Sequence, residues 1–117
     1  MATSALAYVE ARATFARALR EQRISREQLG IAIDRLDVYM ARYALVPVDD
    51  ARLREASDLA DRHTSYALRA LDAIHLASAL RLAAGKPADI TFACWDLRLW
   101  HAAHDEGFTM LPDAEPA

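Results

Sequence analysis

Two aspartates occupy positions in the sequence where a carboxylate could bind a cation. Asp72 lies within residues 69–80, a run in which apolar side chains cover every face of the expected helix, so this helix should be largely buried. A buried carboxylate needs compensation, so Asp72 requires a cationic side chain, several hydrogen-bond donors or a bound metal ion. Asp96 directly follows residues 90–94, an apolar segment that is expected to form a buried strand. In open parallel sheets, ligands bind beyond the carboxyl ends of strands, which places Asp96 at a candidate site.

The elements that would position these two residues alternate between helices and short strands. A capping-box spacing between Ser25 and Gln28 marks the start of one helix, and Gly85 and Gly107 mark the ends of two others. A strand, a helix and a strand at the spacing seen after Gly85 form a parallel crossover unit, so the predicted class is α/β. The expected elements are a helix over 4–21, a helix over 25–43, a strand over 45–48, a helix from Asp49 or Asp50 to about 63, the helix that carries Asp72, a strand over 90–94, a helix over 97–106 and a strand over 108–111.

The composition is that of one soluble globular domain. Of the 117 residues, 54% are hydrophobic and 26% are charged, and the net charge is −3. No apolar stretch approaches the roughly 20 residues of a membrane span and no secretory signal is recognised, so a cytoplasmic location is expected. The single cysteine, Cys94, excludes an internal disulfide and a cysteine-rich zinc cluster. We expect one domain over residues 1–112 and a polar tail over residues 113–117.

The N-terminal part of the chain is locally basic although the whole chain is acidic. Five arginines lie within residues 1–26, against two glutamates in the same segment. An arginine-bearing helix can follow a phosphate backbone. Solvated positions on an amphipathic helix are the other interpretation of the same pattern.

Three segments carry motifs in a fixed order along the chain. Residues 71–79 read LDAIHLASA, residues 90–99 read ITFACWDLRL, and residues 3–10 read TSALAYVE. Together with Gly107 and a closing short strand, these segments resemble the PIN-domain family, in particular toxin ribonucleases of the VapC type. The resemblance covers essentially the whole chain and implies a three-layer α/β/α fold around a short parallel sheet. The C-terminal motif pair is fairly specific, because it fixes two acids, a histidine, a strand and a helix in one order, whereas the motif of residues 3–10 alone is weak.

The resemblance implies a metal-dependent nuclease site. It places Glu10, Asp72 and Asp96 on three of the four acidic positions that hold divalent metal in PIN nucleases. Carboxylate oxygens suit Mg²⁺ or Mn²⁺, and such an ion offsets the negative charge that develops during phosphodiester hydrolysis. Asp72 and Asp96 would be the primary ligands, and Glu10 would bind a second ion or orient water. Ser4 and His75 would add hydrogen bonds at the site.

The function implied by the resemblance is that of an endoribonuclease in a toxin–antitoxin system. RNA would be guided by Arg12, Arg17 and Arg20, and an antitoxin peptide would cover the acidic site and the helical groove formed by residues 4–43. The family's first acid, and the N-terminal strand that carries it, have no counterpart here, so the fold is expected to be N-terminally truncated. A start site called too late, a natural truncation and a strand supplied by another chain are the three explanations. If the chain is whole, an exposed sheet edge predicts a homodimer or strand exchange. The alternative is a catalytically inactive, truncated PIN-like binding module that interacts with an antitoxin or RNA.

Each candidate residue also has a purely structural interpretation. Asp96 could serve only as the N-cap of the following helix, a common role for aspartate. Asp72 could pair with an arginine such as Arg69 or Arg12. Trp95 could stack on a nucleobase, although packing beneath the strand end is the favoured prediction. Glu10 could be a solvated residue on the surface of its helix. His75 could be a histidine of the core whose hydrogen bonds are satisfied there.

Overall fold

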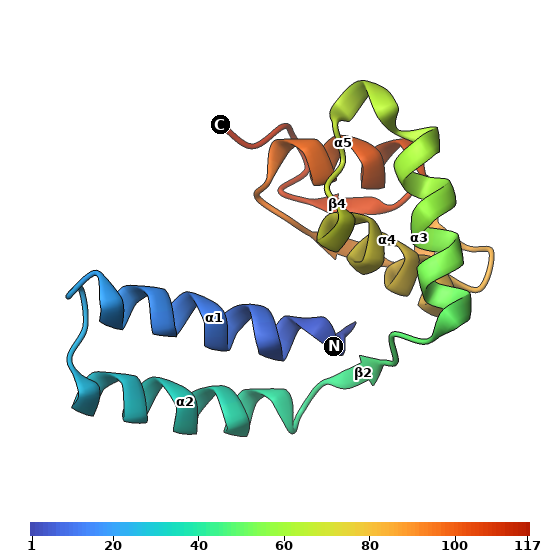
Figure 1. Ribbon diagram of the computed structural model, residues 1–117. Coiled ribbons are helices and arrows are strands. Elements are labelled where there is room, and N and C mark those ends of the chain that lie inside the picture. The colour runs from blue at the N-terminus through green and yellow to red at the C-terminus, as the bar shows by residue number, and fades with distance from the viewer. The chain divides into compact units, whose positions relative to one another are not determined.

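A computed structural model describes all 117 residues and confirms the predicted α/β class (Figure 1). Five helices and four short strands follow one another as β1 (Ala2–Ser4), α1 (Leu6–Arg20), α2 (Arg26–Met40), β2 (Ala44–Val46), α3 (Asp50–Arg62), α4 (Ala70–Ala83), β3 (Thr91–Ala93), α5 (Leu97–Asp105) and β4 (Thr109–Leu111). Short 3₁₀ turns, η1 (Thr64–Tyr66) and η2 (Pro87–Asp89), flank α4. The chain divides into two compact units, Met1–Val46 and Pro47–Ala117.

The first unit is an antiparallel helical hairpin joined to a two-stranded parallel sheet (Figure 1). Strand β1 pairs with β2 so that Ser4 lies opposite Val46. The predicted capping box at the start of α2 is confirmed, because the side chain of Ser25 accepts the N–H of Gln28 and the side chain of Gln28 accepts the N–H of Ser25. This reciprocal pair satisfies two of the backbone donors that every helix leaves without partners in its first turn.

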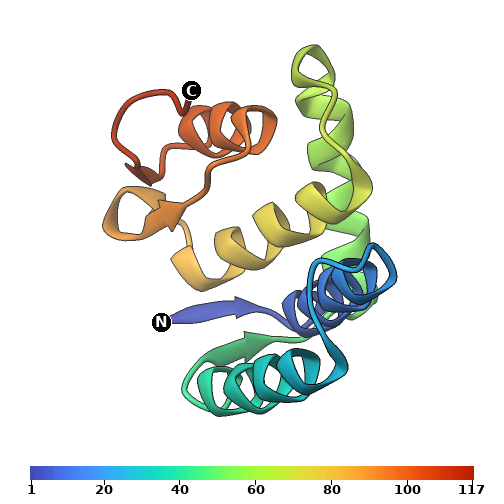
Figure 2. The same ribbon diagram turned by 90° about the vertical axis from the view of Figure 1, so that its left-hand side faces the viewer.

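The second unit packs three helices with the β3–β4 pair, and Figure 2 shows α4 crossing α3 within it. Strands β3 and β4 are parallel, which confirms the predicted crossover through α5. Leu59 of α3 and Leu76 of α4 are fully buried in the same core. Trp100 of α5 is also buried, and its indole N–H donates to the carbonyl of Pro112 over 2.9 Å. The burial of these large side chains stabilises the unit that holds Asp72 and Asp96.

Of the two predictions of burial in this unit, one is wrong and one is confirmed. Strand β3 was expected to be buried, yet Thr91 and Ala93 are exposed, because β3 has β4 as its single sheet neighbour. Helix α4 was expected to be largely buried, and this is confirmed, since Ala73, Leu76 and Ala77 are buried, although Leu71 at its start is exposed. Apolar composition therefore overestimates how many faces of an element find a packing partner. None of the helices is long and apolar enough to cross a membrane.

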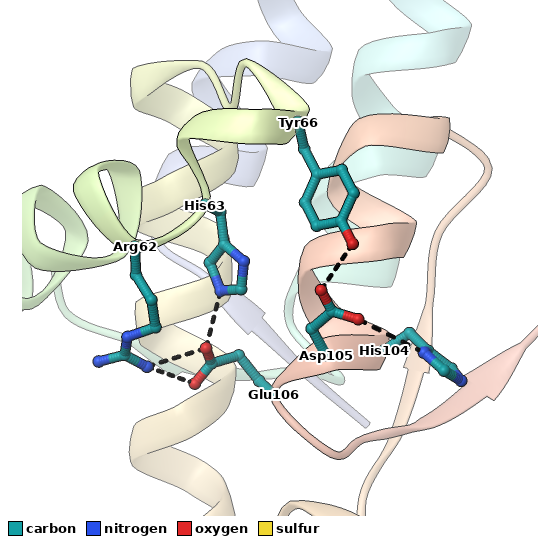
Figure 3. A network of polar contacts seen from close by, with 6 residues as sticks. All are labelled: Arg62, His63, Tyr66, His104, Asp105 and Glu106. Carbon is teal, nitrogen blue, oxygen red and sulfur yellow. Dashed lines mark hydrogen bonds and ion pairs between the residues drawn. The ribbon is translucent and has the colours of Figure 1, made fainter.

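A polar network joins the C-terminal ends of α3 and α5 (Figure 3). The guanidinium of Arg62 donates to both carboxylate oxygens of Glu106, over 2.7 and 2.8 Å. Nε2 of the buried His63 lies 2.7 Å from Oε2 of the same carboxylate. Beside it, the hydroxyl of Tyr66 donates to Asp105 over 2.6 Å, and this bond raises the pKa of Tyr66. Glu106 is thus the shared acceptor that holds the two helix ends together.

Replacing Glu106 by alanine is expected to lower the free energy of unfolding by about 2 kcal/mol, because hydrogen bonds to a charged group are lost and the buried imidazole of His63 loses its partner. Thermal and urea unfolding would measure the change. Asp113→Ala removes the same charge from the exposed C-terminal tail and serves as the control. Equal unfolding midpoints for the two variants would show that the network contributes nothing to stability.

Candidate active site

Asp72 occupies the first turn of α4, where a carboxylate is favoured by the positive end of the helix dipole. Its side chain is 11% exposed, and its Oδ2 accepts a hydrogen bond from Nε of Arg69 over 3.1 Å. Arg69 is the N-cap residue of α4 and has extended backbone angles. The pairing of Asp72 with Arg69, one of the predicted structural alternatives, is therefore present.

Asp96 lies between β3 and α5 and uses its two carboxylate oxygens differently. Oδ1 accepts the backbone N–H of Leu99 over 3.1 Å, which confirms the predicted N-cap role. Oδ2 accepts from Nη2 of Arg69 over 3.3 Å. The side chain is 41% exposed, more than that of Asp72. Asp96 thus caps a helix and at the same time directs one oxygen towards a cation.

One guanidinium therefore joins the two aspartates that the sequence singles out. Arg69 contacts Asp72 through Nε and Asp96 through Nη2, so the two carboxylates face the same side of the second unit. Two like charges that converge in this way destabilise each other unless a cation lies between them. Arg69 supplies that cation in this structure. Its contact with Asp96 could not be read from the sequence, because it requires the β3–α5 connection to meet the start of α4.

Cys94 lies close enough to the two carboxylates for their charges to affect its thiol. Its buried thiol donates to the backbone carbonyl of Asp96 over 3.4 Å. Burial raises the pKa of the thiol, and the negative charges of Asp96 and Asp72 raise it further, while a backbone hydrogen bond of Asp96 acts in the opposite direction. A thiol with a raised pKa is a poor nucleophile at neutral pH, so Cys94 is unsuited to covalent catalysis.

The other predicted site residues are distributed over both units. Glu10 is half-buried on α1, and Ser4 is buried at the end of β1, so both belong to the first unit. His75 is half-buried on α4, three residues after Asp72. Within neither unit do three or more histidine, cysteine, aspartate or glutamate side chains gather to hold a metal ion. The site roles of Glu10, Ser4 and His75 therefore remain predictions.

Comparison with known proteins places the chain in a family. It is 37% identical over 110 residues to Ribonuclease VapC45 of Mycobacterium tuberculosis (strain CDC 1551 / Oshkosh) and, equally, to Ribonuclease VapC49 of Mycobacterium tuberculosis (strain ATCC 25618 / H37Rv). Each alignment covers 94% of this chain and 72% of the relative. The chain belongs to the VapC ribonuclease family. No family model matches it, and no solved structure does.

The arginines that were predicted to contact RNA are all exposed on α1 of this VapC-family chain, but their surroundings differ. Arg12 donates to the hydroxyl of Tyr8 over 3.0 Å and lies over the ring of that residue. Arg17 forms an ion pair with Glu21 over 2.9 Å, and the hydrogen bonds from Arg17 and Arg23 lower the pKa of Glu21. Arg20 has no partner of this kind. Arg12 and Arg20 thus present more of their charge to a ligand than Arg17.

The helical hairpin of the VapC-family chain carries the groove in which an antitoxin was predicted to lie. The groove has a volume of about 470 Å³ and an apolar lining that includes Phe15, Ile24, Ile31, Leu36 and Tyr39. Ile31 and Tyr39 are exposed although both are large and apolar. An apolar groove between two helices fits the nonpolar face of a partner segment.

Trp95 directly precedes Asp96 of the candidate site. The prediction that its side chain packs beneath the strand end is wrong. The side chain is 66% exposed, in contrast to the buried Trp100 five residues later. Its neighbour Cys94 takes the buried position at the end of β3. The alternative prediction, that Trp95 stacks on a nucleobase, is compatible with this exposure and stays a prediction.

Proposed function

We propose that the chain is a Mg²⁺- or Mn²⁺-dependent endoribonuclease of a toxin–antitoxin system, with RNA as its substrate. The observation that carries the proposal is the convergence of Asp72 and Asp96 on one guanidinium in a chain of the VapC ribonuclease family. Two carboxylates that approach one guanidinium can also approach one divalent ion, and such an ion would offset the charge that develops in phosphodiester hydrolysis.

The donor set at this position suits a hard divalent ion. Mg²⁺ is commonly held by one or two carboxylates, with water and phosphate oxygens completing its coordination. Asp72 and Asp96 supply two such carboxylates, and the contacts of Arg69 support the view that one cation can approach both. In the proposal Glu10 contributes a further carboxylate or orients water. When bound, the ion supplies positive charge that offsets the charge developing on the phosphate oxygens.

The remaining side chains bind and orient the substrate. Arg12 and Arg20 contact the RNA phosphates, whereas Arg17 first has to exchange its bond to Glu21. Ser4 and His75 hydrogen-bond to water or substrate at the site. The apolar groove between α1 and α2 receives the antitoxin segment, so that the partner lies over the same helices that guide the RNA.

The metal requirement is tested by cleavage of a structured RNA under three conditions. Cleavage is expected with added Mg²⁺ or Mn²⁺, is expected to stop in excess chelator, and is expected to return when the ion is restored. A calorimetric titration with Mn²⁺ alone is the companion measurement. Cleavage that continues at full rate in chelator would reject the proposed chemistry.

A second candidate function is an inactive module that binds an antitoxin or RNA. The observation in its favour is that Arg69 already forms ion pairs with both carboxylates and that neither unit gathers a third ligand. For such a module, Mn²⁺ would leave the melting temperature unchanged. For the nuclease, Mn²⁺ at about 100 times its dissociation constant is expected to stabilise the folded state by about 2.7 kcal/mol.

A further inference from the structure

We infer that Arg69 is a built-in counter-ion, which holds the carboxylates of Asp72 and Asp96 together in the metal-free protein and must be displaced when a divalent ion binds. The inference rests on the proposed function, since it assigns a role at the same site. Two different nitrogens of one guanidinium reach the two carboxylates, over 3.1 Å to Asp72 and 3.3 Å to Asp96. A cation thus occupies the position between these two acids before any metal arrives.

The contacts of Arg69 are those of an exchangeable partner. Charge-assisted N–H···O bonds are typically about 2.7–2.9 Å long, and both bonds of Arg69 are longer. Arg62 in the same unit shows the contrast, because its Nη1 lies 2.7 and 2.8 Å from the two oxygens of Glu106. The side chain of Arg69 is also 62% exposed, whereas that of Asp72 is 11% exposed. The guanidinium therefore covers the acids from the solvent side, where water can replace it.

A metal ion and Arg69 compete for the same atoms. Oδ1 of Asp96 is engaged by the N–H of Leu99 at the start of α5, so Oδ2 is the oxygen that Asp96 offers to a cation. That Oδ2 is the atom which Arg69 contacts, and Arg69 contacts Oδ2 of Asp72 as well. A divalent ion that binds both carboxylates must therefore take over oxygens that Arg69 engages.

This competition predicts two effects of opposite sign when Arg69 is neutralised. In the metal-free protein, the two carboxylates lose their shared counter-ion and repel each other, which lowers stability. In the metal-binding reaction, no guanidinium has to leave and one repulsive charge is absent, which strengthens binding of the ion. A residue that only supports the architecture of the site would weaken both properties together.

The experiment compares the wild type with Arg69→Gln and with Arg54→Gln, which removes the same charge from an exposed position on α3. Mn²⁺ binding is measured by calorimetry and metal-free stability by thermal unfolding in chelator. Arg69→Gln is expected to bind Mn²⁺ roughly two- to fivefold more tightly than the wild type, because a partly exposed ion pair that competes with the metal is worth up to about 1 kcal/mol. Its metal-free melting temperature is expected to fall by about 2–6 °C. Arg54→Gln is expected to change neither property appreciably.

The outcomes separate this inference from the proposed function. If the wild type binds no Mn²⁺, both fail. If the wild type binds Mn²⁺ and Arg69→Gln binds it equally or more weakly, the proposed function stands and the counter-ion role is overturned. Should Arg69→Gln not fold, Arg69→Met gives the same decision. The methionine side chain is long, flexible and uncharged, so tighter Mn²⁺ binding than in the wild type is again expected and its absence overturns the inference.

Discussion

Replacing Asp72 by asparagine is expected to reduce RNA cleavage by at least about a thousandfold, equivalent to about 4 kcal/mol of transition-state stabilisation, while the protein stays folded. The amide has nearly the shape of the carboxylate and still offers an oxygen to the N–H of Arg69, but it lacks the charge that holds a divalent ion. The stability lost with the Arg69 pair and the helix dipole is expected to be at most about 1 kcal/mol. Initial rates of cleavage at saturating Mn²⁺, together with thermal unfolding in chelator, measure the two effects separately.

Asp58→Asn is the matched control for this substitution. Asp58 is exposed on α3 and its replacement makes the same change of charge in the same unit. Cleavage by this variant should stay within about twofold of the wild type, because surface substitutions of this kind act only weakly. Undiminished cleavage by a folded Asp72→Asn protein would show that the carboxylate serves only its ion pair with Arg69.

Helix boundaries were predictable because the signals that set them are local. Asp49 accepts the N–H of Arg52 at the start of α3, as its position before a helical pattern predicts. Gly107 adopts a φ of +98°, which a side chain would disfavour, and it follows α5 where the sequence places a helix end. Each of these features depends on residues only a few positions apart, so one sequence is sufficient to locate them.

The candidate site was predictable only in part, because its contacts join residues that are distant in the chain. Asp72 was recognised from its apolar surroundings and Asp96 from its place after a strand, and the structure brings these two together. The shared contact with Arg69 depends on tertiary packing, which spacing along one chain does not reveal. The exposure of Trp95 was mispredicted for the same reason, since alternation along β3 does not say which face finds a neighbour.

The core that fixes α4 also fixes the site, because one helix carries residues of both. Asp72 lies in the first turn of α4, and Leu76 lies one turn later, where it is fully buried. Leu76 therefore contributes to the stability of the helix that carries the carboxylate, although the leucine takes no part in binding a cation. The effect of a core substitution on stability can be separated from its effect on metal affinity, because well below the melting temperature the variant is folded and its affinity can be measured.

Replacing Leu76 by alanine is expected to lower the free energy of unfolding by about 3–4 kcal/mol, because a fully buried leucine leaves a cavity that its neighbours fill incompletely. Leu82→Ala on the same helix is the control, and since Leu82 is exposed its loss should be below about 1 kcal/mol. Urea unfolding monitored by circular dichroism measures both. At a temperature where Leu76→Ala remains folded, its Mn²⁺ affinity should equal that of the wild type, because Asp72 and Asp96 are unchanged. Similar losses of stability in the two variants would contradict the assignment of Leu76 to the core.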